Sequence, residues 1–458
     1  MIKKIISILF LFSFLLGFSQ NKQVLYGFSE LPQTLLLNPG AETNYKFHIG
    51  VPLVSGFSTE FGSSGAVLSD LFLSDGRAIN DKVSELLNTL ETRDFLKFNT
   101  QIEVVSGGYR YDDKTYFSFG FYNEIDAIGY FPKDIITLLN EGNAAYLNRS
   151  FDLSQLLYKF DVIGVLHAGI TREINEKLIF GARFKIYSSS LNIETSNNYG
   201  TFTTVDGSNN ILTHYLDNID INFRTSGLVN ADNEIINDAS TYIEKTFLGG
   251  NLGIGLDFGM TYKISDQLEF TGSLLDLGFI HHKSDIRNSS AKGSYVFEGI
   301  EFLYNPSSSP NYWGDLNEDF KEKIPRAENQ DSYISWRPAK VNAALKYSFG
   351  EIRSNYCYDN TYKDFYTNAL GVHLNTVFRA SSPQLELTSF YEKTFTDKFH
   401  AKVTYTVDSY SFYNIGAGVS AQIGKINFYG MVDNILQFSD IAFANSISLQ
   451  LGVNLIFN

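Results

Sequence analysis

The end of this chain alternates strictly between apolar and polar residues. From Ile447 to Phe457 every second residue is large and apolar, and only Ile456 interrupts the polar series between them. A period of two residues is that of a β-strand with one apolar and one polar face. The length suits a transmembrane β-strand, which needs about 9–11 residues when it is tilted. The last strand of a soluble sandwich would have the same pattern, so both interpretations stay open at this point.

The start of the chain has the layout of a secretory signal peptide. Lys3 and Lys4 precede an apolar run over residues 5–18, and polar residues follow Ser19. The run is shorter than the roughly 20 residues that a spanning helix needs. We therefore predict an export signal over residues 1–19.

Composition narrows the class of protein. No later apolar stretch is long enough for a membrane helix, so any membrane crossing must be a closed β-barrel, which satisfies every backbone polar group internally. The aromatic content of 15% suits strand walls and interfacial girdles. A formal net charge of −14 argues against nucleic acid as a partner.

The chain divides into three parts. After the signal, residues 20–45 show neither a helical nor a strand period, and a segment of this size could line or plug a barrel. Residues 46–458 carry the strand pattern. We therefore predict an all-β fold, a transmembrane antiparallel up-and-down barrel with short helices in its loops, and a possible lumen hatch over residues 20–45.

Candidate strands are dense along the third part. They run over residues 47–53, 98–110, 115–123, 160–171, 178–189, 252–264, 268–279, 341–349, 352–358, 365–378, 385–391, 400–407, 415–423, 427–436 and 447–457. A bacterial single-chain barrel needs an even number of strands. Fusing residues 341–349 and 352–358 around a bulge at Gly350 turns these fifteen candidates into about fourteen strands.

The connections alternate between short and long. Two inserts are predicted as outer loops: residues 197–244, with a possible short strand over residues 219–223, and residues 284–337. Barrels carry short periplasmic turns and long outer loops. Short helices are predicted near residues 83–90, 134–139, 152–158 and 315–324, the first capped by Asn80 or Asp81. One hairpin recurs: Gly169-Ile170-Thr171 aligns with Gly259-Met260-Thr261, and the offset is 259 − 169 = 90 residues.

Three features together resemble a known family. They are the export signal, Asn38-Pro39-Gly40 just before the first strand, and Asp433-Asn434-Ile435 near the end of the penultimate strand. The chain resembles uncharacterised outer-membrane barrels from bacteria that use type IX secretion, catalogued as domain of unknown function DUF5723. It is more distantly similar to the long-chain fatty-acid porin superfamily. Relatives usually have Ala where this chain has Gly40.

The resemblance implies a location and roles for short motifs. It implies the outer membrane of a Gram-negative bacterium. Asn38, Pro39 and Gly40 would belong to the hatch. The terminal strand, with Leu455 and Phe457, resembles the closing strand that such barrels present to the barrel-insertion machinery.

No motif predicts an enzyme. A Gly-x-Ser-x-Gly elbow is absent from the sequence. His281 and His282 are adjacent on a strand and would point to opposite faces, so they cannot chelate one metal ion together. Asp206-Gly207-Ser208-Asn209 lacks the ligand spacing of a calcium loop. We expect no catalytic residues, no cofactor-binding residues, no metal site and no cofactor.

Two functions remain open. In the first, the barrel is a porin-like transporter for hydrophobic or amphipathic small molecules. In the second, it is a non-transporting scaffold that docks secreted or surface proteins through its outer loops, in association with type IX secretion. The expected partners are outer-membrane lipid, the insertion machinery and, in the second case, a secreted or surface protein.

Overall fold

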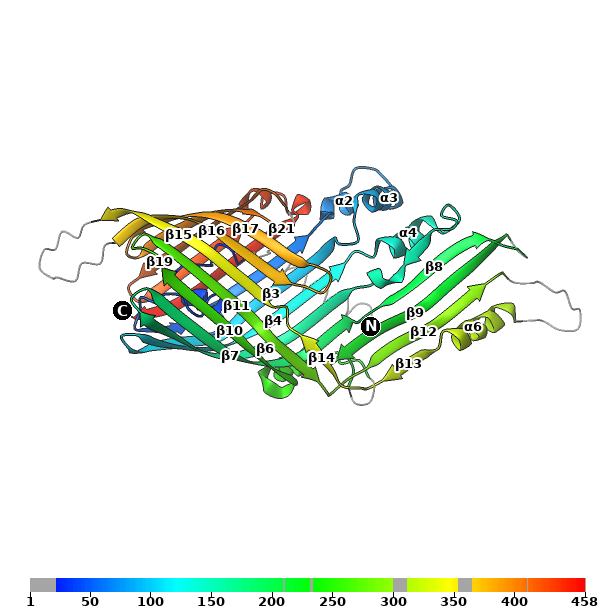
Figure 1. The fold of residues 1–458 in the computed structure, drawn as a ribbon, viewed down its shortest axis with the longest axis horizontal. Coiled ribbons are helices and arrows are strands. Elements are labelled where there is room, and N and C mark those ends of the chain that lie inside the picture. The colour runs from blue at the N-terminus through cyan, green and yellow to red at the C-terminus, as the bar shows by residue number, and fades with distance from the viewer. Residues whose placement is uncertain are drawn as a thin grey trace, which may run out of the picture.

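The structure is a computed structural model that describes residues 22–208, 211–230, 234–299, 311–352, 365–409 and 411–457. The predicted export signal over residues 1–19 and the predicted strand residues 353–358 lie outside the described residues. Figure 1 shows a barrel whose strands continue on one side into a flat sheet.

A single antiparallel ring of fourteen strand positions forms the barrel, as predicted. Each position pairs with the next, and the last pairs with the first. In ring order the positions are β1 (Phe47–Gly50) with β2 (Phe57–Ser63), β3 (Phe95–Asp112), β4 (Thr115–Tyr130), β6 (Tyr158–Asn175), β7 (Leu178–Thr195), β10 (Asn251–Lys263), β11 (Leu268–His282), β14 (Tyr333–Trp336) with β15 (Lys340–Ile352), β16 (Phe365–Phe378), β17 (Pro383–Thr396), β18 (Phe399–Val407), β19 (Asn414–Ile423), β20 (Ile426–Asp433) and β21 (Ser446–Phe457).

The ring closes between the first and the last of the predicted strands. Phe47 of β1 lies opposite Phe457 of β21, and their rings are 5.3 Å apart between centroids. Phe57 of β2 lies opposite Leu451. Because both ends of the ring are paired, no sheet edge is left in the barrel wall.

The two-residue rhythm separates the inside from the outside. In β21 the side chain of Asn454 is fully buried and faces the lumen, whereas Leu451 is 38% exposed on the outer surface. Leu387 and Val403 are likewise exposed on the outer wall, and Thr404 and Thr406 are buried inside. The outer surface is therefore an apolar belt and the lumen is polar, as in transmembrane barrels.

The first ring position is interrupted at Pro52. After Gly50 the chain leaves the ladder, Leu53 takes a positive φ of 64°, and pairing resumes at Phe57. Proline has no N–H to donate, so a wall strand cannot continue unbroken through it. The predicted strand over residues 47–53 is shorter, and β2 completes its position.

Gly350 lies within one strand, as the predicted fusion requires. β15 runs through this glycine, whose φ is 75°, and reaches Ile352 opposite Phe365. No shift of register accompanies it, so the predicted bulge is wrong: glycine accommodates the left-handed backbone without displacing the ladder.

Short turns gather at one end of the barrel. The strand-to-strand connections that the structure describes there are residues 113–114, 176–177, 264–267, 397–398 and 424–425. The opposite, outer end carries the helices. These are α2 (Leu68–Phe72), α3 (Ile79–Thr89), α4 (Lys133–Glu141), α5 (Ala239–Glu244), α6 (Tyr312–Lys323), and the short turns η1 (Pro32–Leu36, inside the lumen), η2 (Leu153–Gln155), η3 (Lys245–Gly249), η4 (Ile435–Gln437) and η5 (Ile441–Phe443).

The predicted helices are confirmed with different ends. Ala78, not Asn80 or Asp81, precedes the first turn of α3, and its side chain makes no capping hydrogen bond. Of the helix expected over residues 152–158 only the single turn η2 forms, because Tyr158 already belongs to β6. No helix among the described residues is long and apolar enough to cross a membrane.

The two predicted outer loops are in fact a folded sheet, which we call the outer extension. It consists of β5 (Ser150–Asp152), β8 (Tyr199–Asp206), β9 (Leu212–Ser226), β12 (Asn288–Phe297) and β13 (Arg326–Asn329), and projects beyond the barrel in Figure 1. Ile219, Tyr295 and Ile324 form an apolar cluster against which α6 packs. The possible strand over residues 219–223 is confirmed as part of β9. The expectation of loops for the rest was wrong because β9 and β12, one from each insert, pair with each other, which neither insert reveals alone.

Candidate functional site in the lumen

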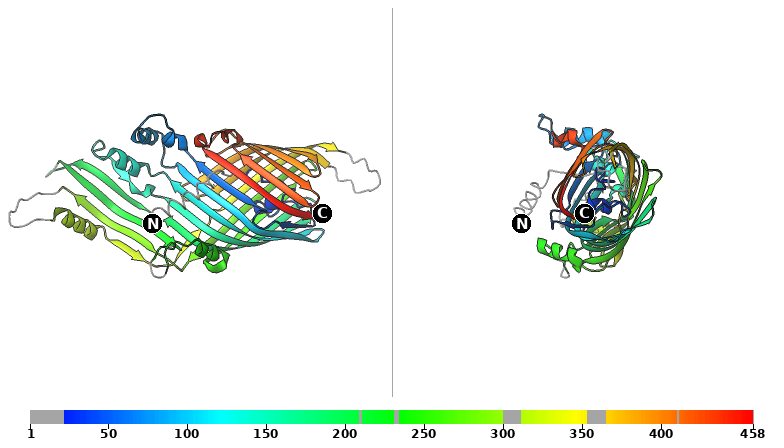
Figure 2. Two further views of the ribbon diagram at one scale, coloured as in Figure 1. Left: turned by 180° about the vertical axis from the view of Figure 1, so that it is seen from behind. Right: turned by 90° about the vertical axis from the view of Figure 1, so that its left-hand side faces the viewer.

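Residues 22–45, which we call the lumen segment, lie inside the ring. Figure 2 shows them as dark blue coil surrounded by strands when the barrel is viewed along its length. Val24, Leu25, Tyr26, Phe28 and Leu31 are all nearly completely buried. They cluster with apolar residues of the wall, so the lumen segment supplies a small hydrophobic core inside an otherwise polar barrel.

A second apolar cluster explains the irregularity in the terminal strand. Ile456, which interrupts the polar series of β21, faces inward and is 4% exposed. It packs with Leu35, Ala41 and Tyr45 of the lumen segment and with Tyr116 of β4. An apolar residue stands in the lumen face because the lumen segment covers it.

Wall strands around the ring hold the lumen segment by hydrogen bonds. Lys402 of β18 donates to the Tyr26 carbonyl at 2.6 Å, and Ser273 of β11 donates to the Leu37 carbonyl at 2.6 Å. The phenol of Tyr26 donates to Thr271 at 3.1 Å and its ring stacks on His373 at 4.0 Å.

Gln33 joins three parts of the barrel. Its side-chain amide exchanges hydrogen bonds with that of Asn454 at 2.9 and 3.0 Å. The same amide nitrogen donates to the carbonyl of Ser55, in the interrupted first ring position, and to the carboxylate of Glu103 at 3.2 Å. Removing Gln33 would leave buried polar groups unpaired, which costs free energy.

The Asn38-Pro39-Gly40 turn is held by its backbone. Thr171 of β6 donates to the Pro39 carbonyl at 2.6 Å, and Thr261 of β10 donates to the Gly40 carbonyl at 2.8 Å. These are the threonines that the 90-residue recurrence aligns. The two hairpins thus present equivalent hydroxyl groups to consecutive carbonyl groups of one turn.

Two wall glycines make room for that turn. A Cβ atom at Gly181 would lie 1.9 Å from the Pro39 carbonyl oxygen, and one at Gly259 would lie 2.1 Å from the Asn38 Oδ1. A Cβ at Gly40 would itself lie 2.5 Å from the Gly259 carbonyl oxygen. Alanine therefore cannot replace Gly40 here without a backbone shift.

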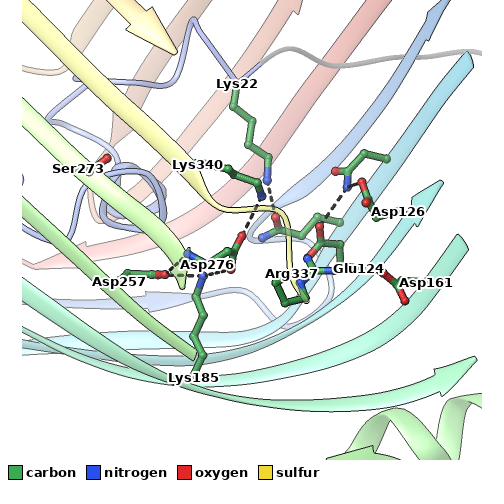
Figure 3. Close-up of polar contacts among 12 residues, drawn as sticks. Lys22, Glu124, Asp126, Asp161, Lys185, Asp257, Ser273, Asp276, Arg337 and Lys340 are labelled. Atoms are coloured by element: carbon green, nitrogen blue, oxygen red, sulfur yellow. Dashed lines mark hydrogen bonds and ion pairs between the residues drawn. The ribbon is translucent and has the colours of Figure 1, made fainter. Parts of the chain in front are cut away.

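Beside the lumen segment the wall carries a network of buried charges, drawn in Figure 3. Asp276 of β11 accepts from Lys185 at 2.6 Å and lies 2.9 Å from Lys340, and Asp257 lies 2.8 Å from Lys185. Asp276 has a φ of 57° at a break of register between β10 and β11. This bulge turns the carboxylate inward next to Leu275, which is also buried.

A second group of buried ion pairs lies nearer the outer mouth. Arg337 contacts Glu124 at 2.8 Å, and Arg379 contacts Asp126 at 2.5 Å. Asn99 donates to both carboxylates. Pairing of this kind offsets the cost of burying each charge and fixes the geometry of the lumen wall.

Several cavities lie along the lumen; the smallest, about 20 Å³, is lined by Pro32, Gln33 and Leu36 of the lumen segment and shares Leu36 with the central cavity described next. The outer cavity, about 400 Å³, and the central cavity, about 70 Å³, share Arg379 in their linings. Lys22, Leu36 and Leu37 of the lumen segment line the central cavity. The inner cavity, about 290 Å³, has Tyr45 in its lining and shares no lining residue with the central one. The lumen segment thus lies between the central and inner cavities.

Comparison with protein families identifies the chain. The model of the family of unknown function DUF5723 matches residues 39–433. The chain belongs to this family. The match begins at Pro39, within the turn held by Thr171 and Thr261, and ends at Asp433. No curated protein matches the chain.

Several solved structures are similar to this DUF5723 member over most of their length, at low identity. The Ralstonia pickettii toluene transporter TbuX is 10% identical with a TM-score of 0.42, over 96% of this chain and 99% of that chain. A Pseudomonas aeruginosa FadL homologue is 9% identical with a TM-score of 0.45, over 96% and 100%. The Pseudomonas putida toluene transporter TodX is 9% identical with a TM-score of 0.36, over 96% of both chains.

The location of this DUF5723 member follows from its surface. A closed ring with an apolar outer belt and a polar lumen satisfies its backbone internally and exposes its apolar side chains to lipid. The chain is an outer-membrane protein. Its short turns lie at the periplasmic end, and the outer extension projects from the opposite end, away from the cell.

The remaining predicted motif residues are structural contacts. Ser448 donates to the Asp433 carboxylate at 2.6 Å, and the Asn434 side chain donates to the Ser446 carbonyl at 2.8 Å. Asn434 has a φ of 55°, which ends β20 before the predicted residue 436. Ile435 opens η4 at the outer rim and is 45% exposed. The family motif therefore forms the end of β20 and the β20–β21 connection, and only its first residue approaches the lumen segment: a Cβ at Gly416 would lie 2.3 Å from the Asp433 Oδ1 and 2.9 Å from the Val24 Cγ2.

The terminal strand residues face outward. Leu455 lies opposite Ile49 and Ile426, and the Lys425 ammonium lies 4.7 Å from the centre of the Phe457 ring. His282 is buried and His281 is exposed, so adjacent histidines point to opposite faces as predicted. Within the described ranges, no three His, Cys, Asp or Glu side chains are grouped so as to hold a metal ion.

Sequence reasoning missed the charged groups of the lumen. Lys185, Asp257 and Asp276 occur inside predicted strands, at positions where the wall alternates. Charged residues in membrane strands face the lumen, because the lipid side disfavours them. A charged residue inside a predicted membrane strand was thus the sequence signal that could have identified these lumen residues.

Proposed function

We propose that this protein is a gated outer-membrane channel in which the lumen segment closes the route through the barrel. The observation that carries the proposal is the position of residues 22–45 between the central and inner cavities, with contacts to wall strands around the ring. A solute can cross only if this segment moves or rearranges. Its contacts are hydrogen bonds, apolar packing and the ion pair of Glu42 with Lys263, with no covalent cross-link to the wall among the described residues, so movement needs no covalent bond to break.

The outer cavity favours small amphipathic molecules with an acidic group as the solute. One part of its lining is apolar and includes Ile128, Leu157, Trp336 and Phe378. The charged part has four cationic side chains and one carboxylate, namely Lys159, Arg224, Arg337, Arg379 and Glu194. Arg337 pairs with Glu124 of β4 and Asp161 of β6, and Arg379 pairs with Asp126 of β4; these three carboxylates do not line this cavity.

Conductance of the purified barrel in a planar bilayer tests the gate. Deleting residues 22–37 should raise single-channel conductance several-fold, because the central and inner cavities then join. The matched control fixes the segment instead: Gln33→Cys with Asn454→Cys, in a Cys357→Ser background, joined by a reducible bis-maleimide. This barrel should stay closed until the linker is reduced. Equal conductance in all of these states would contradict the proposal.

Uptake into vesicles tests the solute class separately. Vesicles containing the barrel should take up a short alkyl carboxylate faster than the alcohol or amine of equal chain length. Lys159→Gln with Arg224→Gln should remove that preference, because both side chains line the outer cavity and are partly exposed. Equal uptake of the three solutes by the unmodified barrel would contradict the acidic class while leaving the gate untouched.

A second candidate function is a scaffold for secreted or surface proteins, favoured by the outer extension being folded. A hollow of about 260 Å³ lies on it, lined by Asn143, Phe202, His214, Leu216, Tyr295, Phe297 and Phe320. The His214 ring lies between those of Phe202 and Phe297, with its centroid 5.8 Å from each of theirs, and each pair of rings is within 13° of parallel. A photo-reactive residue at Trp313, which is 71% exposed on α6, should cross-link one defined protein in whole cells. Absence of any cross-linked product would contradict this role.

A further inference from the structure

Two short stretches from opposite ends of the chain meet at the outer end of the barrel wall. One is α2 with Leu73, and the other is the turn from η4 to η5, residues 435–443; α2 contacts η5. We call this pair the rim shelf. Figures 1 and 2 show α2 and the neighbouring red turns outside the ring of strands, not across its opening.

The rim shelf exposes large apolar side chains. Phe72 is 74% exposed and Leu436 is 65% exposed, and four others are between 44% and 49% exposed: Leu68, Leu73, Ile435 and Phe443. Exposure of apolar surface to water is unfavourable. A group of such side chains on neighbouring turns marks a surface that another apolar medium covers.

Polar contacts hold α2 in place without covering its apolar side chains. Asp75, just after α2, accepts from Arg77 at 2.7 Å and lies 2.9 Å from the Lys82 ammonium of α3. Hydrogen bonds from Lys82 and Arg77 hold the pKa of Asp75 well below its usual range. The carboxylate therefore stays ionised in mild acid, and α2 stays fixed to α3 with Phe72 exposed.

The shelf continues the lipid-facing belt of the wall. α2 follows β2, η4 follows β20 and η5 precedes β21, and these strands are neighbours in the ring. We propose that the rim shelf is an interfacial anchor whose apolar side chains insert among the outer-leaflet acyl chains close to the head groups. Continuity with the belt and the position outside the ring favour lipid over a protein partner, which would have to bind beside the membrane surface.

Quenching of tryptophan fluorescence by brominated lipid tests this directly. The chain has two tryptophans, both in the outer part of the protein, and Trp313→Phe with Trp336→Phe gives a silent background. Phe72→Trp or Leu436→Trp is then reconstituted in phosphatidylcholine vesicles brominated near the carbonyl end or near the middle of the acyl chains. Val403→Trp, an outward-facing position in the middle of β18, is the control for a tryptophan deep in the acyl chains. Ile211→Trp, 85% exposed on the outer extension, is the control for a tryptophan in water.

The expected result is a depth order. Both shelf tryptophans should lose most of their fluorescence with bromine near the carbonyl end and less with bromine at mid-chain. Val403→Trp should show the reverse order, and Ile211→Trp should show no loss with either lipid. Two independent shelf positions keep the test valid if one variant fails to insert. A shelf tryptophan that behaves like Ile211→Trp, or that is quenched mainly at mid-chain, would overturn the proposal.

Discussion

The lumen segment is held in two different ways along its length. Residues 22–37 are held mainly by their own side chains, through an apolar cluster around Tyr26 and Leu31 and the amide pair of Gln33 with Asn454. Lys402 and Ser273 add scattered hydrogen bonds to the carbonyl groups of Tyr26 and Leu37. Residues 38–40 are held by their backbone: wall threonines donate to two consecutive carbonyl groups, and wall glycines let the turn approach.

The difference indicates which part moves. Side-chain contacts in the first part are spread over the ring, and each is of ordinary strength, so they can be exchanged one after another. The second part fits against β6, β7 and β10 with no space for a single extra methyl group. In the channel that we propose, residues 22–37 are the moving part and the Asn38-Pro39-Gly40 turn is the fixed point.

The largest expected effect comes from filling the glycine sites. Gly181→Ala or Gly259→Ala places a Cβ within 2.1 Å of atoms of the turn, and overpacking of this degree costs about 3 kcal/mol or more. Hydrogen exchange of the whole lumen segment, followed by mass spectrometry, should accelerate by about 100-fold. Gly272→Ala is the matched control, because its nearest neighbours would be 3.6 Å from the new Cβ. Equal exchange in all three variants would show that the turn is not the fixed point.

A smaller effect is expected at the amide pair. Gln33→Leu leaves the fully buried Asn454 amide unpaired, which costs about 1–3 kcal/mol. Exchange should accelerate in residues 22–37 and channel opening should become more frequent. Gln33→Leu with Asn454→Leu should recover much of the loss, because two apolar groups replace two polar ones. A double variant as unstable as the sum of the single ones would argue against direct coupling.

The paired threonines should separate the two parts. Thr171→Val or Thr261→Val removes one hydrogen bond to the turn, worth about 0.5–1.5 kcal/mol, and should accelerate exchange near residues 38–43 only. Thr271→Val removes the acceptor of the Tyr26 hydroxyl and should act on residues 22–37 instead. The two-part description fails if all three variants accelerate exchange over the same residues.

The smallest effect is expected at the periplasmic end of the segment. Lys263 and Glu42 form an ion pair of 3.1 Å, with about a third of each side chain exposed. Exposed pairs of this kind are worth about 1 kcal/mol or less. Lys263→Gln should therefore change exchange near Glu42 only slightly at low salt and not at all in roughly 1 M salt, where charges are screened within about 3 Å. A large effect that persists in high salt would mean that this contact, too, fixes the segment.

Much of the barrel could be predicted from local patterns. Alternation located all fourteen ring positions, because one face of each strand meets lipid and the other meets the lumen. Pro52 marked the interruption of the first position because it cannot donate to the ladder. The outer extension could not be predicted, since β9 and β12 stabilise each other across some seventy residues of sequence, as in the pair Ile221 and Ala291.

The site was only partly predictable for a similar reason. Asn38, Pro39 and Gly40 stood out as a motif, but their partners Thr171 and Thr261 were visible only as a recurrence without a known purpose. Asp433 and Asn434 stood out equally and form a turn at the outer rim instead. A short motif indicates that the backbone forms a particular turn, but it does not indicate which part of the protein that turn contacts.

By itself the sequence determined a closed wall, its number of strands and which face of each strand meets lipid, because these follow from a period of two residues and from the need to pair every backbone group in a membrane. Only the tertiary structure decided what occupies the lumen. Thr171, Gly181, Asn454 and Ile456 lie far from residues 22–45 along the chain and acquire a common role only when ring closure brings their strands around that segment. Such contacts depend on three-dimensional distance, which no local pattern encodes.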